Sequence, residues 1–309
     1  MNQNRLERVH VQRIQMARCA MLLGLGACLG SAQGTDTIFA DGFDSCGSLT
    51  RPIYAFDTSN ALLRFDPTLI GSQTAPIQSL GVPNCNVGSP LPGWMGTSVI
   101  SMSVDRMGSV WALYSSGEIF TINPATLACA NTGYVPAQTA AWQLFNMAFA
   151  GPVTANEQSV YVSGGSVDMG SVGNLGKIDP VALTVQTIGA LGGTADASVP
   201  LAGVGTSDLF GLYQAFTPTT YVRQIDRATG AVVGSPLAVP GFGANTSAWA
   251  FAHWGGKFWI FVTNDNGTVS TTTLYSVDRV TGAQQSVLAN LPFIPTSAGS
   301  STCVPTTVN

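Results

Sequence analysis

Short apolar runs alternate with turn residues along most of the chain, and one such pattern recurs five times. In each copy a strand that begins with an aromatic residue is followed by a turn and by a second strand that ends in Asp or Asn. The aromatic strands begin at Tyr54, Trp111, Tyr161, Phe210 and Phe258, and the second strands end at Asp66, Asn123, Asp179, Asp226 and Asp278. The steps between these terminal residues are 57, 56, 47 and 52 positions. A period of this length fits four short strands with their turns, which is the blade of a β-propeller.

The terminal Asp and Asn residues predict tight turns. Each is followed by Pro or Arg and then by small or Thr-Gly-like residues. Asp and Asn side chains accept hydrogen bonds from the backbone one or two residues further on, so we expect these residues to form the turn that leads into the next strand.

A strand of small or apolar residues precedes the aromatic strand in four of the copies, at residues 98–104, 143–149, 201–204 and 249–254. Small side chains suit the crowded innermost strand of a blade. The first copy lacks such a strand, whereas residues 297–304 at the other end of the chain supply a spare one. We therefore expect an all-β propeller of five four-stranded blades, closed by the C-terminal strand so that no sheet edge is left free.

The N-terminal residues have the pattern of an export signal. Four arginines (Arg5, Arg8, Arg13 and Arg18) precede an apolar run at 19–29, and small residues follow it. This order is typical of a signal peptide, and the run is shorter than the roughly 20 residues that span a bilayer. We divide the chain into a signal segment (1–34), an N-terminal leader (35–50), the propeller (51–304) and a C-terminal tail (305–309).

The exported protein can be either freely secreted or anchored by a lipid. Leu25-Gly26-Ala27-Cys28 is similar to a bacterial lipobox, whose cysteine is acylated after cleavage. A lipid anchor at Cys28 and plain secretion are both compatible with this segment. In either case we expect a secreted, periplasmic or outer-surface protein without a transmembrane segment. Residues 38–44 resemble a short segment found near the termini of exported bacterial proteins, and its role stays open.

Charge changes the set of expected partners. Only 9% of the residues are charged, and beyond residue 34 the chain has 8 Lys and Arg against 15 Asp and Glu, a net charge of −7. A surface of this sign repels phosphate backbones, so nucleic acid is not expected as a partner. We expect a monomer.

Four cysteines follow the signal segment, and an even number in an oxidising compartment predicts two disulfides. Cys303 belongs to the closing strand and Cys46 lies just before the first blade, so these two are expected to lie close together. Cys85 and Cys129 are placed in consecutive connections between blades, on one face of the ring. The preferred pairing is therefore Cys46 with Cys303 and Cys85 with Cys129, one of three pairings that four cysteines allow.

Family resemblance supports the propeller prediction. The segment from Val104 to Thr126, with Trp111-Ala-Leu-Tyr and Ile119-Phe-Thr-Ile-Asn123-Pro, resembles the repeats of NHL-like and streptogramin-lyase-like propellers. The rest of the chain, including residues 249–259 and the end Gly299-Ser-Ser-Thr-Cys303, looks like a group of uncharacterised exported bacterial proteins of propeller type. The second resemblance implies no activity.

Few residues suit catalysis. His253 is the sole histidine beyond the signal segment, in a Trp-rich inner-strand sequence, where a core or channel-lining imidazole is the first expectation and a general base the second. Streptogramin-lyase-like enzymes depend on histidine and a divalent metal near the channel, and a single histidine leaves that activity without a matched partner. Asn264-Asp265-Asn266-Gly267 is read as a hairpin turn and not as a calcium loop. We expect no cofactor and no metal.

A binding surface fits the composition better. Aromatic faces with nearby carboxylates suit sugars or cationic peptides, although aromatic residues of this kind also pack loops onto blades. The candidate binding residues are Trp94, Tyr134, Trp142 and Phe242 in connections between blades, with Asp57, Asp168 and Asp265 on neighbouring hairpin turns. We expect an exported non-catalytic propeller that binds a protein, peptide or glycan. The alternative is a lyase or hydrolase that uses carboxylates and His253 near the channel, and convergence of His253 with two or more carboxylates in one concave site would favour it.

Overall fold

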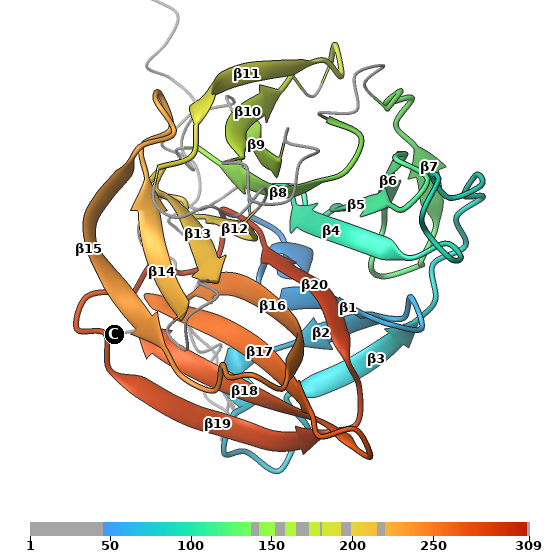
Figure 1. Ribbon diagram of the computed structural model, residues 1–309. Coiled ribbons are helices and arrows are strands. Elements are labelled where there is room, and N and C mark those ends of the chain that lie inside the picture. Colours follow the sequence, from blue (N-terminus) through green and yellow to red (C-terminus); the bar gives the residue numbers. More distant parts are fainter. Residues whose placement is uncertain are drawn as a thin grey trace, which may run out of the picture. The chain divides into compact units, whose positions relative to one another are not determined.

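The computed structural model describes residues 46–136, 142–151, 158–164, 173–179, 181–192, 199–214 and 220–307. These residues form five four-stranded antiparallel sheets arranged in a ring, a five-bladed β-propeller (Figure 1). The signal segment with Cys28, the segment 38–44, Asp168 and the last two residues lie outside the described residues.

The first blade combines the two ends of the described chain. Its strand order is β20-β1-β2-β3, with β20 innermost. The strands are β20 (Pro295–Ser300), β1 (Ile53–Asp57), β2 (Leu62–Phe65) and β3 (Ile77–Gly81). The short 3-10 helices η2 (Ser48–Thr50) and η3 (Pro67–Leu69) flank β1 and β2. The prediction that the C-terminal strand completes the first blade is confirmed, because β20 pairs with β1 from Ile53↔Ser300 onward.

The other four blades follow the chain in order, each from its inner to its outer strand. Blade 2 consists of β4 (Val99–Val104), β5 (Val110–Tyr114), β6 (Ile119–Ile122) and β7 (Cys129–Asn131). Blade 3 consists of β8 (Phe145–Ala150), β9 (Ser159–Gly164), β10 (Asn174–Ile178) and β11 (Val185–Ala190). Blade 4 consists of β12 (Leu201–Gly203), β13 (Leu209–Gln214), β14 (Thr220–Ile225) and β15 (Val232–Val239). Blade 5 consists of β16 (Thr246–Trp254), β17 (Lys257–Asp265), β18 (Ser270–Asp278) and β19 (Gln284–Leu291).

The hydrophobic core lies between the blades. Successive side chains of a strand point to opposite faces of its sheet, so each blade buries one set of residues against each neighbour. In β1, Ile53 and Ala55 pack with residues of blade 5, whereas Tyr54 and Phe56 pack with residues of blade 2. The same division repeats around the ring, which gives one buried cluster at each of the five junctions.

The innermost strands approach one another closely, as their small residues predict. A Cβ atom added to Gly203 would clash with the carbonyl oxygen of Phe149 in the neighbouring blade 3. Serine hydroxyls join neighbouring inner strands: the backbone N–H groups of Met147 and Phe149 donate to Ser101 Oγ at 2.9 Å and Ser103 Oγ at 2.8 Å. A larger side chain at these positions would push adjacent blades apart.

The predicted inner strands differ from the observed ones only at their ends. The closing strand was expected at 297–304, but β20 runs from Pro295 to Ser300. Residues 301–304 form a turn instead, in which the Val304 N–H donates to the Ser301 carbonyl oxygen at 3.2 Å. This turn takes Cys303 out of the sheet and toward Cys46.

The acidic residues at the strand ends form turns, as predicted. Asp278 Oδ1 accepts from the N–H groups of Val280 at 3.0 Å and Thr281 at 2.7 Å. Asp66, Asn123, Asp179 and Asp226 accept corresponding backbone bonds. These bonds lower the pKa values of Asp179, Asp226 and Asp278, because the backbone N–H groups stabilise the carboxylate form.

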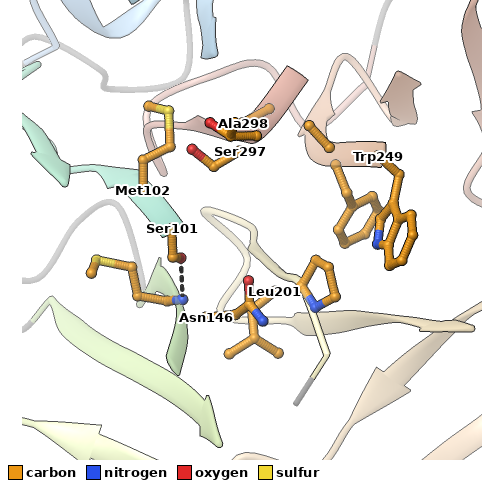
Figure 2. A pocket seen from close by; sticks show the side chains of 12 residues that line it. Ser101, Met102, Asn146, Leu201, Trp249, Ser297 and Ala298 are labelled. Atoms are coloured by element: carbon orange, nitrogen blue, oxygen red, sulfur yellow. Dashed lines mark hydrogen bonds between the residues drawn. The ribbon is translucent and has the colours of Figure 1, made fainter. Parts of the chain in front are cut away.

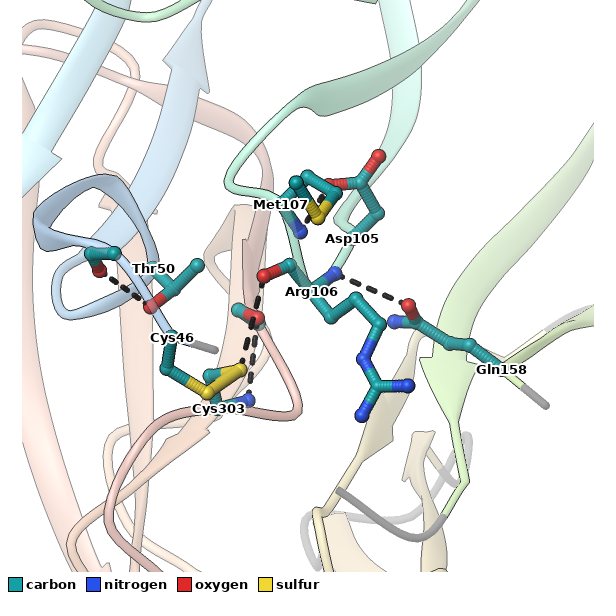
Figure 3. Close-up of a disulfide and its surroundings, with 9 residues drawn as sticks. Cys46, Thr50, Asp105, Arg106, Met107, Gln158 and Cys303 are labelled. Atoms are coloured by element: carbon teal, nitrogen blue, oxygen red, sulfur yellow. Dashed lines mark hydrogen bonds between the residues drawn. A yellow bond between two sulfur atoms is a disulfide. The ribbon is translucent and has the colours of Figure 1, made fainter. Parts of the chain in front are cut away.

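Both predicted disulfides are present, Cys46–Cys303 with a Cα–Cα distance of 5.8 Å and Cys85–Cys129 with 5.0 Å. Cys46–Cys303 lies beside the turn of blade 2 that contains Arg106, whose carbonyl oxygen is 3.7 Å from Cys303 Sγ (Figure 3). The expected position of Cys129 was wrong, since this residue begins the outer strand β7 and does not lie in a connection between blades. Its partner Cys85 does lie in such a connection, so this bond ties blade 1 to blade 2.

Candidate binding face

One face of the ring, which we call the connection face, carries two kinds of segment. These are the hairpin turns between the second and third strands of a blade, and the connections from the outer strand of one blade to the inner strand of the next. Hydrogen bonds join the two kinds: Thr58 N–H donates to Ile294 O at 3.0 Å and Asp265 N–H donates to Asn245 O at 2.8 Å. The remaining turns, including those of Asp66 and Asp278, lie at the other ends of the strands, on what we call the opposite face.

The connection between blades 1 and 2 is held in place from both sides. From blade 1, the Asn60 amide donates to Thr97 O at 3.0 Å and accepts from Val99 N–H at 3.0 Å. From blade 2, Ser115 O accepts from Leu91 N–H at 2.8 Å and Ser115 Oγ donates to Gly96 O at 3.0 Å. Both ends of the stretch 91–97 are therefore fixed by neighbouring turns.

This fixed stretch presents two apolar side chains to solvent. Trp94 is 45% exposed, and its neighbour Met95 is fully exposed. Val135, in the following connection, is also exposed, and Pro136 beside it contacts the turn of blade 2 at Gly117. Neighbouring apolar side chains that are exposed on an ordered backbone can form part of a ligand-binding surface.

The other predicted aromatic residues are covered to different degrees. Tyr134 and Trp142 are buried, both beside the Phe145 ring, with centroid distances of 5.9 Å and 6.5 Å. Phe242 is half-buried and lies 5.9 Å from the Trp249 ring. Of the four predicted aromatics, Trp94 thus offers the greatest area to a ligand.

The predicted carboxylates form hairpin turns on this face. Asp57 Oδ1 accepts from the N–H groups of Ser59 and Ala61, both at 2.9 Å. Asp265 Oδ1 accepts from Gly267 N–H at 2.7 Å, and its Oδ2 accepts from the Ser270 hydroxyl at 3.1 Å. Asn266 and Gly267 therefore lie in the hairpin turn that the Asn-Gly pair predicts, between the paired residues Asp265 and Ser270.

Two candidate residues were not predicted from the sequence. Glu118 Oε2 accepts from Gly88 N–H at 2.7 Å and so attaches the connection between blades 1 and 2 to the hairpin turn of blade 2. Met95 extends the exposed surface beside Trp94. Glu118 lies in the hairpin turn between the second and third strands of its blade, as Asp57 does in the first repeat, and this shared turn is the sequence signal that could have identified it.

The axis of the ring is nearly filled. The inner strands of all five blades enclose a cavity of about 20 Å³, lined by Ser101, Asn146, Leu201, Trp249 and Ser297, among others (Figure 2). A space of this size holds about one water molecule. This cavity is too small to hold a sugar or a peptide.

His253 lies away from this cavity, between blades 5 and 4. Its side chain is fully buried, with the Phe258 ring 5.7 Å away, and neither ring nitrogen has a hydrogen-bond partner among the residues that the structure describes. His253 is therefore the core imidazole that was expected as one of two possibilities, and it does not line the axial cavity. Burial, and then the positive charge of Arg279, lower the pKa of His253 to about 3, so the ring is neutral at pH 7.

The described ranges contain neither a metal-binding cluster nor a membrane-spanning helix. There, no three His, Cys, Asp or Glu side chains lie close enough together to hold a metal ion. In the same ranges, no helix has the length and apolar character of a membrane span.

Comparison with known proteins gives likenesses of fold. No protein-family model matches the chain, and no curated protein matches it. Similar solved structures include TolB from Acinetobacter baumannii, at 11% identity over 81% of this chain and 54% of that one, with a TM-score of 0.42. They also include the arabinanase Arb43A of Bacillus subtilis, at 12% identity over 62% of this chain and 79% of that one, with a TM-score of 0.41. At such identities and TM-scores a likeness says nothing about activity, so the function has to be inferred from this chain's own residues.

Proposed function

We propose that the protein is an exported, non-catalytic propeller that binds a protein, peptide or glycan at the cell envelope through its connection face. The observation that carries this proposal is the exposure of Trp94 on a stretch fixed by hydrogen bonds from two blades. A surface that is already ordered loses little conformational entropy when a ligand binds. An indole ring presents a large, rigid area for stacking.

Export is part of the proposal. Its support is the order of basic, apolar and small residues in the first 34 positions, together with two disulfides, which persist in oxidising compartments. Mass spectrometry of the protein from membrane and soluble fractions tests whether the mature chain carries a lipid on Cys28.

The alternative, a lyase or hydrolase with a site near the channel, lacks support from the described residues. Such a site needs His253 and carboxylates to converge in a concave space. His253 is buried between two blades, and the axial cavity of about 20 Å³ does not include it. The carboxylates Asp57 and Asp265 belong to hairpin turns on the connection face.

Binding can be tested with glycan arrays and with detergent-solubilised cell-envelope fractions passed over the immobilised protein. The Trp94→Ala variant removes the exposed ring, and Met107→Ala removes an exposed apolar side chain from a turn on the opposite face. We expect the wild type and Met107→Ala to retain the same ligand and Trp94→Ala to lose most of it. The proposal would be overturned if the wild type bound nothing on the glycan arrays and nothing from the envelope fractions, or if Trp94→Ala retained as much ligand as the wild type.

A further inference from the structure

The charged residues are distributed unequally between the two faces of the ring. The described segments of the connection face carry Asp57, Glu118 and Asp265 and contain no Lys or Arg. The eight basic residues that the structure describes lie within strands or toward the opposite face: Arg51, Arg64, Arg106, Lys177, Arg223, Arg227, Lys257 and Arg279. The connection face is therefore acidic, although its loops are built mainly of uncharged residues.

No described Lys or Arg forms an ion pair with the three acidic residues of this face. The ion pairs among the described residues are Arg64–Asp66 at 3.2 Å and Arg279–Asp208 at 3.4 Å, which involve the opposite ends of the strands. The three connection-face carboxylates accept hydrogen bonds from uncharged groups, which orient them but leave their charge in place. The basic residue of blade 4 that comes nearest this face, Arg223, lies over the Tyr221 ring at 5.5 Å.

Two of these charges belong to turns that bond to the connection carrying the exposed apolar side chains: the Asp57 turn bonds through Asn60 to Thr97, and Glu118 bonds to Gly88. Asp265, Asp57 and Glu118 belong to blades 5, 1 and 2. These blades are consecutive around the ring (Figure 1), and Trp94 and Met95 lie in the connection from blade 1 to blade 2. An indole ring attracts a cation to its face, most strongly when carboxylates nearby add to the field. A second copy of the acidic face is repelled, and a neutral glycan makes no use of the charges.

We propose that the connection face docks a cationic peptide segment, with its Arg or Lys side chains against Trp94 and opposite Asp57, Glu118 and Asp265. This inference rests on the proposed binding function and names the class of partner. The inference requires that the affinity for the peptide depend on both the aromatic ring and the carboxylates. It also requires that salt weaken binding, because exposed charges are screened over about 10 Å at 0.1 M ionic strength.

The test uses the full chain and a fluorescently labelled deca-arginine peptide, with a Gly-Ser peptide of equal length as the neutral probe. The double variant Asp57→Asn/Asp265→Asn removes two charges while leaving an oxygen at each position to accept the turn hydrogen bonds. The matched control is Asp179→Asn, which makes the same change in a turn on the opposite face, where Asp179 accepts from the N–H groups of Val181 and Ala182.

We expect deca-arginine to bind in 20 mM salt and the Gly-Ser peptide not to bind. The double variant should raise Kd about tenfold, or about threefold for each charge removed. Trp94→Ala should raise it about fivefold. Asp179→Asn should leave it unchanged, and 300 mM salt should weaken wild-type binding more than binding by the double variant.

Three results would overturn the inference: no binding of deca-arginine, equal Kd values for the wild type and the double variant, or a loss with Asp179→Asn as large as that with the double variant. If, in addition, a glycan or an uncharged peptide is retained through Trp94 with no effect of salt, the binding function stands and the cationic partner is wrong. If neither peptides nor envelope fractions are retained, the binding function fails as well.

Discussion

Cys303, near the end of the chain, is bonded to Cys46, which is 257 positions earlier and lies just before the first strand of blade 1. The strand β20 that precedes Cys303 pairs with β1, which follows Cys46. The covalent bond thus reinforces the place where the ring closes.

We predict that removing this bond costs more stability than removing the other one. In the chain-entropy model, a bond that closes a longer loop restricts the unfolded chain more, so Cys46→Ala/Cys303→Ala should cost about 5.5 kcal/mol, or about 10 °C in Tm. Cys85→Ala/Cys129→Ala, whose bond spans 44 positions, is the control and should cost less. Thermal unfolding of the two double variants under non-reducing conditions compares them, and a higher Tm for the Cys46/Cys303 variant would contradict the prediction.

His253 predicts a pH dependence of stability. Its pKa is about 3 in the folded protein, below the ordinary value of 6.5, so the unfolded state binds the proton more tightly. The contribution of neutral His253 to the free energy of unfolding is therefore fully present above pH 6.5. It falls as the pH decreases toward 3, by about 1.4 kcal/mol per pH unit. Urea unfolding between pH 7 and 4.5 measures this slope before most carboxylates titrate.

The control for this slope is His253→Leu, which keeps a similar volume without a titrating group. This variant should lack most of the loss between pH 6.5 and 4.5. At pH 7 it should be at least as stable as the wild type, because two buried nitrogens without described partners are removed. The same pH slope in both proteins would show that His253 does not carry it.

The close approach of the inner strands predicts that Gly203 accepts no side chain. Gly203→Ala places a methyl group against the Phe149 carbonyl of the neighbouring blade 3 and should cost about 3 kcal/mol. Gly243→Ala, in a connection where an added Cβ meets nothing within 4 Å, should change the free energy of unfolding by less than about 0.5 kcal/mol. Equal stability of the two variants in urea unfolding would mean that the blades do not meet at Gly203.

Much of the fold could be predicted because the repeat carries its own turn chemistry. Asp278 and its counterparts form turns through bonds to the next few backbone N–H groups, which are local interactions that a sequence pattern reveals. The place of β20 could be predicted because the first repeat lacks an inner strand. The boundary at Ser300 could not, since it depends on the turn that takes Cys303 to Cys46.

The candidate site was harder to predict, because the exposure of an aromatic residue depends on distant contacts. Trp94 and Trp142 both lie in connections between blades. Trp142 meets Phe145 and is buried, whereas Trp94 lies between Gly93 and Gly96, which provide no side chains to cover it. The sequence also places His253 in an inner strand without showing which junction between blades its ring enters.

Hydroxyl-radical footprinting of the protein with and without the ligand retained in the binding screens tests the proposed function most directly. Bound ligand should protect Trp94 and Met95, with smaller protection of the hairpin turns at 57–61 and 115–118. The turns at 105–108 and 278–282 on the opposite face should react equally in both samples. Protection confined to the opposite face, with Trp94 as reactive as in the free protein, would contradict the account.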